Sequence, residues 1–121
     1  MILVDTSVWI DHLRRRQPRL MEVLLADQVL CHPFVIGELA CGRIKQRHEI
    51  LSLLQALPEA QTIGHDEALA FVETHRLTGA GIGWIDVHLL ASAVLSHAVL
   101  WTLDAKLQKV AEAQDVALTV Q

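Results

Sequence analysis

Near its start the chain carries a short, fully apolar segment, Ile2-Leu3-Val4, which ends directly at the acidic residue Asp5. A strand covered on one face alternates apolar and polar residues, whereas a strand covered on both faces is apolar throughout. Strands of the second kind belong to parallel sheets, because the helices that connect parallel strands cover both faces. The segment therefore predicts an α/β domain with Asp5 at the carboxyl end of a buried strand.

The rest of the sequence alternates strand and helix patterns. Further strands are expected at 29–31, 98–102 and 116–120, and a short edge strand can form at 61–63. Helices are predicted from Thr6 through Leu13, over 19–26, from Pro33 to near Gly42, and over 43–57, 65–77, 84–97 and 105–113. The glycine-rich residues 79–83 predict a loop. This alternation indicates a parallel sheet with helices on both faces.

Length and composition predict one domain over residues 1–121. The hydrophobic content of 52% is enough to fill one core without disulfides, and Cys31 and Cys41 are interpreted as reduced, small apolar residues. No apolar run approaches the roughly 20 residues that span a bilayer, and no secretory signal pattern is present. We therefore expect a cytoplasmic protein without membrane segments.

The net charge of −4 argues against a nucleic-acid binder if it is taken alone. The distribution of charge matters more than the sum, because four acids in one pocket would account for the whole excess. Such a pocket would leave the basic residues free to form a rim, although a solvated helix face explains any one of them equally well. These basic residues are Arg14, Arg15, Arg16, Arg19, Arg43, Lys45 and Arg47.

Four acids occupy positions that suit a ligand site. Ligands of open parallel sheets bind beyond the carboxyl ends of the strands, where Asp5 follows the first strand and Asp104 follows the predicted strand 98–102. Asp86 is expected near a helix N-terminus, which favours a carboxylate. Glu38 stands in an otherwise apolar stretch, where a buried and unpaired carboxylate would be costly.

A divalent cation would stabilise all four acids together, because hard ions such as Mg²⁺ bind carboxylate and water oxygens. Each acid taken singly also has an ordinary structural interpretation. Asp5 or Asp104 can cap a helix, Asp86 can interact with a helix dipole, and Glu38 can face solvent. The joint arrangement is what favours a metal site.

Four segments in order along the chain resemble the PIN-domain ribonucleases, and above all the VapC-type toxins of type II toxin–antitoxin pairs. They are Ile2-Leu3-Val4-Asp5-Thr6-Ser7-Val8-Trp9-Ile10, Pro33-Phe34-Val35-Ile36-Gly37-Glu38-Leu39, Ile85-Asp86 and Thr102-Leu103-Asp104-Ala105-Lys106-Leu107. The resemblance covers essentially the whole chain. It implies a three-layer α/β/α PIN-like domain and an endoribonuclease that depends on Mg²⁺ or Mn²⁺. Hydrolysis of this kind leaves 5′-phosphate and 3′-hydroxyl ends.

The resemblance also implies roles for individual residues and partners. The metal-binding and catalytic acids would be Asp5, Glu38, Asp86 and Asp104. Hydroxyl groups supporting them would come from Thr6, Ser7 and Thr102, although helix capping explains the hydroxyls equally well. We expect the RNA substrate, a tRNA or ribosomal RNA, to be held by Arg14, Arg15 and Arg43. A cognate antitoxin and a homodimer are implied as well.

Other functions stay open from the residues alone. A metal-independent ribonuclease would use two histidines and yield cyclic phosphate; His32 is the histidine expected nearest the pocket. A haloacid-dehalogenase-type phosphatase would need a second aspartate where Ser7 stands, and a receiver domain would need an acidic pair that is not clear here. The non-enzymatic alternative is an α/β protein-binding module whose acids only cap helices. Metal binding and RNA cleavage distinguish these alternatives.

Overall fold

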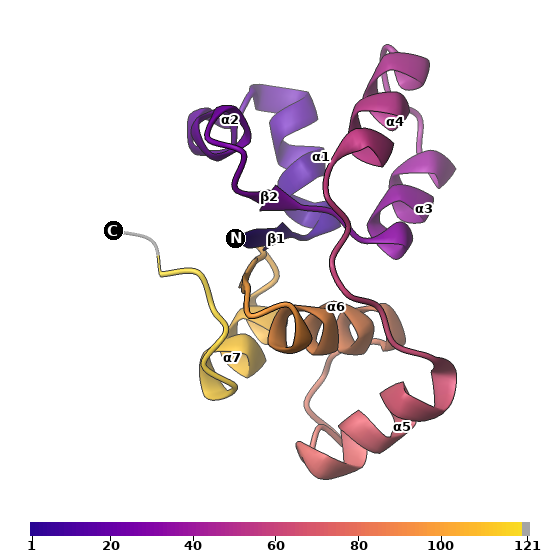
Figure 1. The fold of residues 1–121 in the computed structure, drawn as a ribbon, viewed down its shortest axis with the longest axis vertical. Coiled ribbons are helices and arrows are strands. Elements are labelled where there is room, and N and C mark those ends of the chain that lie inside the picture. The colour runs from indigo at the N-terminus through magenta and orange to yellow at the C-terminus, as the bar shows by residue number, and fades with distance from the viewer. Residues whose placement is uncertain (120–121) are drawn as a thin grey trace.

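The computed structural model describes residues 1–119. Figure 1 shows β1 and β2 between two groups of helices, with α1 to α4 on one side and α5 to α7 on the other. The predicted three-layer α/β/α arrangement is therefore confirmed. The elements are β1 (Ile2–Val4), α1 (Thr6–Arg15), α2 (Pro18–Leu25), β2 (Val29–Leu30), α3 (Pro33–Cys41), α4 (Arg47–Ala56), α5 (His65–Thr74), α6 (Trp84–Leu95), β3 (Val99–Trp101) and α7 (Ala105–Ala113).

The sheet is parallel, in the order β2-β1-β3. The central strand β1 pairs Leu3 with Leu30 on one side and with Leu100 on the other. Leu3 and Leu100 are completely buried, which explains why β1 is apolar at every position. Since all three strands run the same way, the residues that follow them, Asp5, His32 and Thr102, lie at one edge of the sheet.

Helix α6 is the central helix of the core. It contacts β1 and β3, and every side chain from Val87 to Ala93 is buried. The small residues of this segment allow close packing against the sheet. Asp86 comes just before the buried segment, so the first turn of α6 carries it to the edge of the core.

Three predicted elements differ in the structure. The helix expected from residue 43 begins at Arg47, because Gln46 adopts a left-handed backbone conformation with φ of 52° and residues 43–46 form a loop. The edge strand expected at 61–63 is wrong; a single bridge joins Glu59 to Cys31 instead. The strand expected at 116–120 is reduced to one bridge between Ala117 and Leu100, and its last residue lies outside the described part of the chain.

Within residues 1–119, none of the helices combines the length and the apolar character that crossing a membrane requires.

Candidate active site

Asp5 is fixed at the carboxyl end of β1 by backbone and side-chain hydrogen bonds. Its amide N–H donates to the carbonyl oxygen of Trp101 in the neighbouring strand at 2.9 Å. Its buried carboxylate accepts two hydroxyl donors on the same oxygen, Oδ2: Ser7 Oγ and Thr102 Oγ1, each at 2.7 Å. The Asp5 side chain therefore has one orientation, set jointly by α1 and β3.

The same hydroxyl groups hold the segment that carries Asp104. The amide of Asp104 donates to Thr102 Oγ1 at 3.0 Å, and the amide of Leu103 donates to Ser7 Oγ at 3.0 Å. Asp104 Oδ1 in turn accepts from the amide of Leu107 at 2.9 Å, so that Asp104 caps α7. Thr102 thus links the carboxylate of Asp5 to the backbone of Asp104.

The other two acids come from α3 and α6. Glu38 Oε1 accepts from Thr6 Oγ1 at 2.7 Å, which joins α3 to the start of α1. Glu38 is exposed, so the free-energy cost of burying an unpaired carboxylate does not arise. Phe34 and Gly37 are exposed too. Only part of this apolar stretch therefore faces the core. Asp86 Oδ2 accepts from the amide of Gly83 at 3.2 Å and so caps α6.

All four acids share a pattern of hydrogen bonding. Each accepts protein donors on a single oxygen, and among residues 1–119 no protein donor reaches the second oxygen. The oxygens without a donor are Asp5 Oδ1, Glu38 Oε2, Asp86 Oδ1 and Asp104 Oδ2. No lysine or arginine neutralises these acids either, since the ion pair between Arg15 and Asp11 is the only one in the described residues.

The four acids lie in one electrostatic field. Burial raises the pKa of Asp86; the N–H of Gly83 opposes this, and the negative charges of Asp5, Asp104 and Glu38 raise the pKa further. Thus Asp86 experiences all three of the other carboxylates. That the four acids share one pocket stays a prediction; the structure shows that the charges of the other three act on Asp86.

The donor set fits a hard divalent cation. Carboxylate oxygens without protein donors and without a basic partner are suitable ligands for Mg²⁺ or Mn²⁺. Over residues 1–119, no three Asp, Glu, His or Cys side chains are placed to hold one ion together. In this arrangement a single ion would contact at most two of these carboxylates directly, and waters would complete its coordination, as is common for Mg²⁺.

His32 follows β2 and is almost completely buried. Its Nδ1 accepts from the amide of Phe34 at 2.9 Å, so it caps α3 and carries its proton on Nε2. Burial, followed by the neighbouring His88, lowers the pKa of His32 to about 4. The ring is therefore neutral at pH 7, and its position suits a structural role better than acid–base catalysis.

The lowered pKa of His32 predicts a pH-dependent stability. The unfolded chain binds a proton at His32 near pH 6.5 and the folded chain only near pH 4, so stability falls as pH falls through this window, by about 3 kcal/mol. His32→Asn keeps a capping acceptor without the titration. Urea unfolding of both proteins at pH 7.5 and pH 4.5 should show a smaller loss for the variant; equal losses contradict this assignment.

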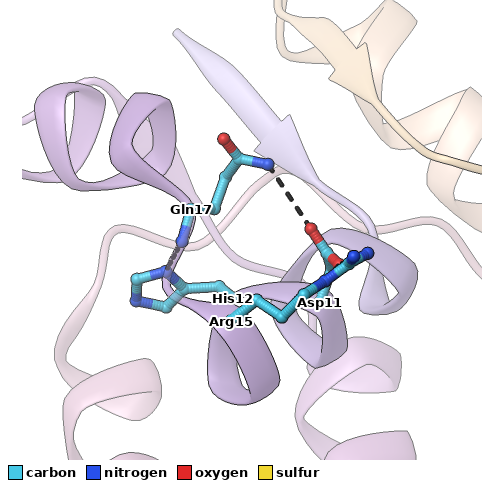
Figure 2. A network of polar contacts seen from close by, with 4 residues as sticks. All are labelled: Asp11, His12, Arg15 and Gln17. Atoms are coloured by element: carbon cyan, nitrogen blue, oxygen red, sulfur yellow. Dashed lines mark hydrogen bonds and ion pairs between the residues drawn. The ribbon is translucent and has the colours of Figure 1, made fainter.

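A groove of about 630 Å³ runs beside Glu38. Its lining includes Arg14 from α1 and Arg43 and Lys45 from the loop before α4. Of the three arginines predicted to bind RNA, Arg14 and Arg43 line this groove. Arg15 does not: its guanidinium binds Asp11 at 2.8 Å, as the close view in Figure 2 shows together with Gln17 and His12.

The aromatic residues near the acids were not predicted from the sequence. Phe34 lies one helical turn before Glu38, and Trp84 lies two residues before Asp86. Both rings contact His88. The one sequence feature that could have pointed to these rings is that each lies within four positions of a predicted catalytic acid, Glu38 or Asp86.

Comparison with known proteins identifies the family of the chain. The family model of the PIN domain matches residues 2–113. The chain is also similar to Ribonuclease VapC32 of Mycobacterium tuberculosis, both in strain CDC 1551 / Oshkosh and in strain ATCC 25618 / H37Rv. In each case 50% of 119 aligned residues are identical, covering 98% of this chain and 96% of the relative. The chain therefore belongs to the PIN-domain family.

Proposed function

We propose that this chain is a divalent-metal-dependent endoribonuclease and the toxin of a type II toxin–antitoxin pair, acting as a single domain over residues 1–121. One observation carries the proposal: four carboxylates have no basic partner in the described residues and each has one oxygen free of protein donors, and the charges of three of them act on the fourth, Asp86. The similarity to Ribonuclease VapC32, with 50% of the aligned residues identical, supports the same activity.

The residues of the site have different roles in this proposal. The catalytic and metal-binding acids are Asp5, Glu38, Asp86 and Asp104. When bound, Mg²⁺ or Mn²⁺ supplies a water of lowered pKa and stabilises negative charge on the phosphate. The hydroxyls of Ser7 and Thr102 keep Asp5 in one orientation, and that of Thr6 orients Glu38. Burial raises the pKa of Asp86, and the negative charges of Asp5, Asp104 and Glu38 raise it further, so a bound cation would favour the charged form of Asp86.

RNA cleavage tests this proposal. Purified protein, freed of any antitoxin, is incubated with total RNA in Mg²⁺ or Mn²⁺ and, in parallel, in EDTA, and the ends of the products are mapped. We expect discrete cuts with 5′-phosphate and 3′-hydroxyl ends that disappear in EDTA. Cuts that resist EDTA and carry cyclic phosphate would favour histidine chemistry, and no cleavage of diverse RNAs would favour a protein-binding module.

The groove beside Glu38 is the proposed path of the RNA backbone, since Arg14 and Arg43 can contact phosphates there. Arg43→Ala should weaken binding of single-stranded RNA and reduce the slope of log K against log salt by about 0.7, the value of one lost phosphate contact. Arg15→Ala is the matched control, because Arg15 binds Asp11. Equal salt slopes for the wild type and the Arg43 variant, measured by fluorescence anisotropy, contradict this placement.

The proposed partners follow from the family. We propose a tRNA or ribosomal RNA as the substrate, a cognate antitoxin that covers the acidic site, a homodimer, and a cytoplasmic location. The chain is 50% identical, over 98% of its length, to Ribonuclease VapC32, and this similarity supports a toxin of the VapC type.

The histidine ribonuclease is the weaker candidate. His32, the histidine expected nearest the pocket, has its Nδ1 occupied as a helix cap and a pKa lowered to about 4. A general acid or base is most effective when its pKa lies near the operating pH. These observations favour carboxylates and a cation.

A further inference from the structure

Five rings form a continuous cluster beside the acids. Successive ring centroids lie 5.1 Å apart from His32 to Phe34, 4.8 Å from Phe34 to His88, 5.0 Å from His88 to Trp84 and 5.2 Å from Trp84 to His65. The cluster joins the N-terminal ends of α3, α5 and α6. We call these residues the ring cluster.

Two members of the ring cluster remain accessible to solvent. Phe34 is 39% exposed and Trp84 is 38% exposed, whereas Trp9 and Trp101 are buried. Single exposed aromatic residues are ordinary. Here, however, two accessible rings flank one buried imidazole, His88, whose side chain holds them in a fixed relation.

The ring cluster borders the site of the four acids. Phe34 and Glu38 are four residues apart on α3 and so lie on the same face, one turn from each other. Trp84 shares the first turn of α6 with Asp86. Phe34 therefore lies one turn before Glu38 on α3, and Trp84 lies in the turn of α6 that carries Asp86.

The two accessible rings of the cluster, those of Phe34 and Trp84, are apolar and carry no charge. Such a surface offers little to a phosphate, which is held by cations and N–H donors. It suits the flat face of a nucleobase, because proteins bind unpaired RNA bases by stacking them on aromatic side chains.

We infer that Phe34 and Trp84 form a stacking platform for an unpaired base next to the phosphate that is cut. The inference rests on the proposed ribonuclease function and adds to it two residues that bind the substrate, Phe34 and Trp84, which lie outside the four acids and outside the arginine groove. In this arrangement the groove with Arg14 and Arg43 contacts the backbone on one side of the acids, and the platform contacts a base on the other.

The test combines substitutions in the protein with substitutions in the RNA, as in a double-mutant cycle. The probe is a 12-nucleotide single-stranded RNA that contains the mapped cut, made intact and with an abasic nucleotide at each position near the cut. Trp84→Ala and Phe34→Ala should each raise KM about tenfold on intact RNA, with a smaller change in kcat. Trp84→Phe should restore most of the affinity, because it keeps an aromatic ring.

One abasic position should abolish the difference between the wild type and Trp84→Ala, which identifies the stacked base. Leu95→Ala is the matched control, since Leu95 lies at the far end of the same helix and is 43% exposed. It should leave KM unchanged. Circular dichroism and size-exclusion chromatography of every variant report on folding and assembly.

The outcomes separate the platform from the ribonuclease. If the wild type cuts RNA while Trp84→Ala and Phe34→Ala keep its KM, the platform is overturned and the ribonuclease stands. If the ring variants change the oligomeric state, a second copy of the chain covers the rings, and the platform is again overturned. If the wild type cuts no RNA, the proposed function itself fails.

Discussion

Asp5→Asn should lower the rate of RNA cleavage about 10³-fold while the protein stays folded. Asp5 is the buried acid of the site, and its orientation is fixed by Ser7 and Thr102. Asparagine keeps an oxygen that can accept these hydroxyl donors but removes the negative charge that attracts a cation. Loss of charge stabilisation at a catalytic centre commonly costs two to three orders of magnitude in rate, roughly 10²–10³-fold.

Asp11→Asn is the control for this variant, because Asp11 lies on the same helix α1 and pairs with Arg15 rather than with the site. An exposed ion pair of this kind contributes about 1 kcal/mol or less, so this variant should cleave RNA at the wild-type rate. Single-turnover cleavage rates and thermal unfolding of the three proteins give the comparison. If Asp5→Asn retains more than a tenth of the wild-type rate, Asp5 is not a catalytic acid.

Thr102→Val should lower activity about 10- to 100-fold and raise the Mg²⁺ concentration needed for half-maximal rate. Thr102 Oγ1 donates to Asp5 Oδ2 and accepts from the amide of Asp104. Valine has nearly the same shape but neither hydrogen bond, so Asp5 and Asp104 lose their common support. Groups that orient metal-binding side chains typically contribute this much to affinity or activity.

Two further variants separate positioning from a general effect on stability. Thr102→Ser restores the hydroxyl group and should restore most of the activity at low Mg²⁺. Thr78→Val makes the same change at an exposed position after α5 and should leave the Mg²⁺ dependence unaltered. An unchanged Mg²⁺ dependence in Thr102→Val would show that the hydroxyl group does not position the acids.

The central part of the fold could be predicted from the sequence because it depends on local patterns. The apolar run of β1 indicates a strand covered on both faces, and Asp5 necessarily follows it at the carboxyl edge. Thr102 and Asp104 follow β3 at the same edge for the same reason. The contact between Thr102 Oγ1 and Asp5 Oδ2 needs only the parallel pairing of β1 with β3.

The features that were not predicted depend on packing between distant segments. The sequence left open whether Glu38 is buried or faces solvent, because an almost uniformly apolar stretch does not reveal which side of α3 is exposed; in the structure Glu38 is exposed. The pairing of Arg15 with Asp11 requires a choice among side-chain conformations. The loop at 43–46 rests on the left-handed conformation of Gln46 and on a hydrogen bond from Arg47 to Gly42 O.

The ring cluster was missed for a similar reason. Phe34 and Trp84 are 50 positions apart in the sequence, and only the packing of α3 near α6 brings both against His88. A helical pattern gives the face of each helix but not its partner.

Direct binding of Mn²⁺ tests the central claim, that the four carboxylates form one site for a divalent cation. Free Mn²⁺ is measured by electron paramagnetic resonance as it is titrated into the wild type, Asp5→Asn and Asp11→Asn without RNA. The wild type and Asp11→Asn should bind Mn²⁺ with equal affinity. Asp5→Asn should bind Mn²⁺ at least tenfold more weakly. The rate of RNA cleavage should increase with the fraction of protein that has Mn²⁺ bound. Equal binding by Asp5→Asn and the wild type, or cleavage without bound Mn²⁺ or another divalent ion, would contradict the account.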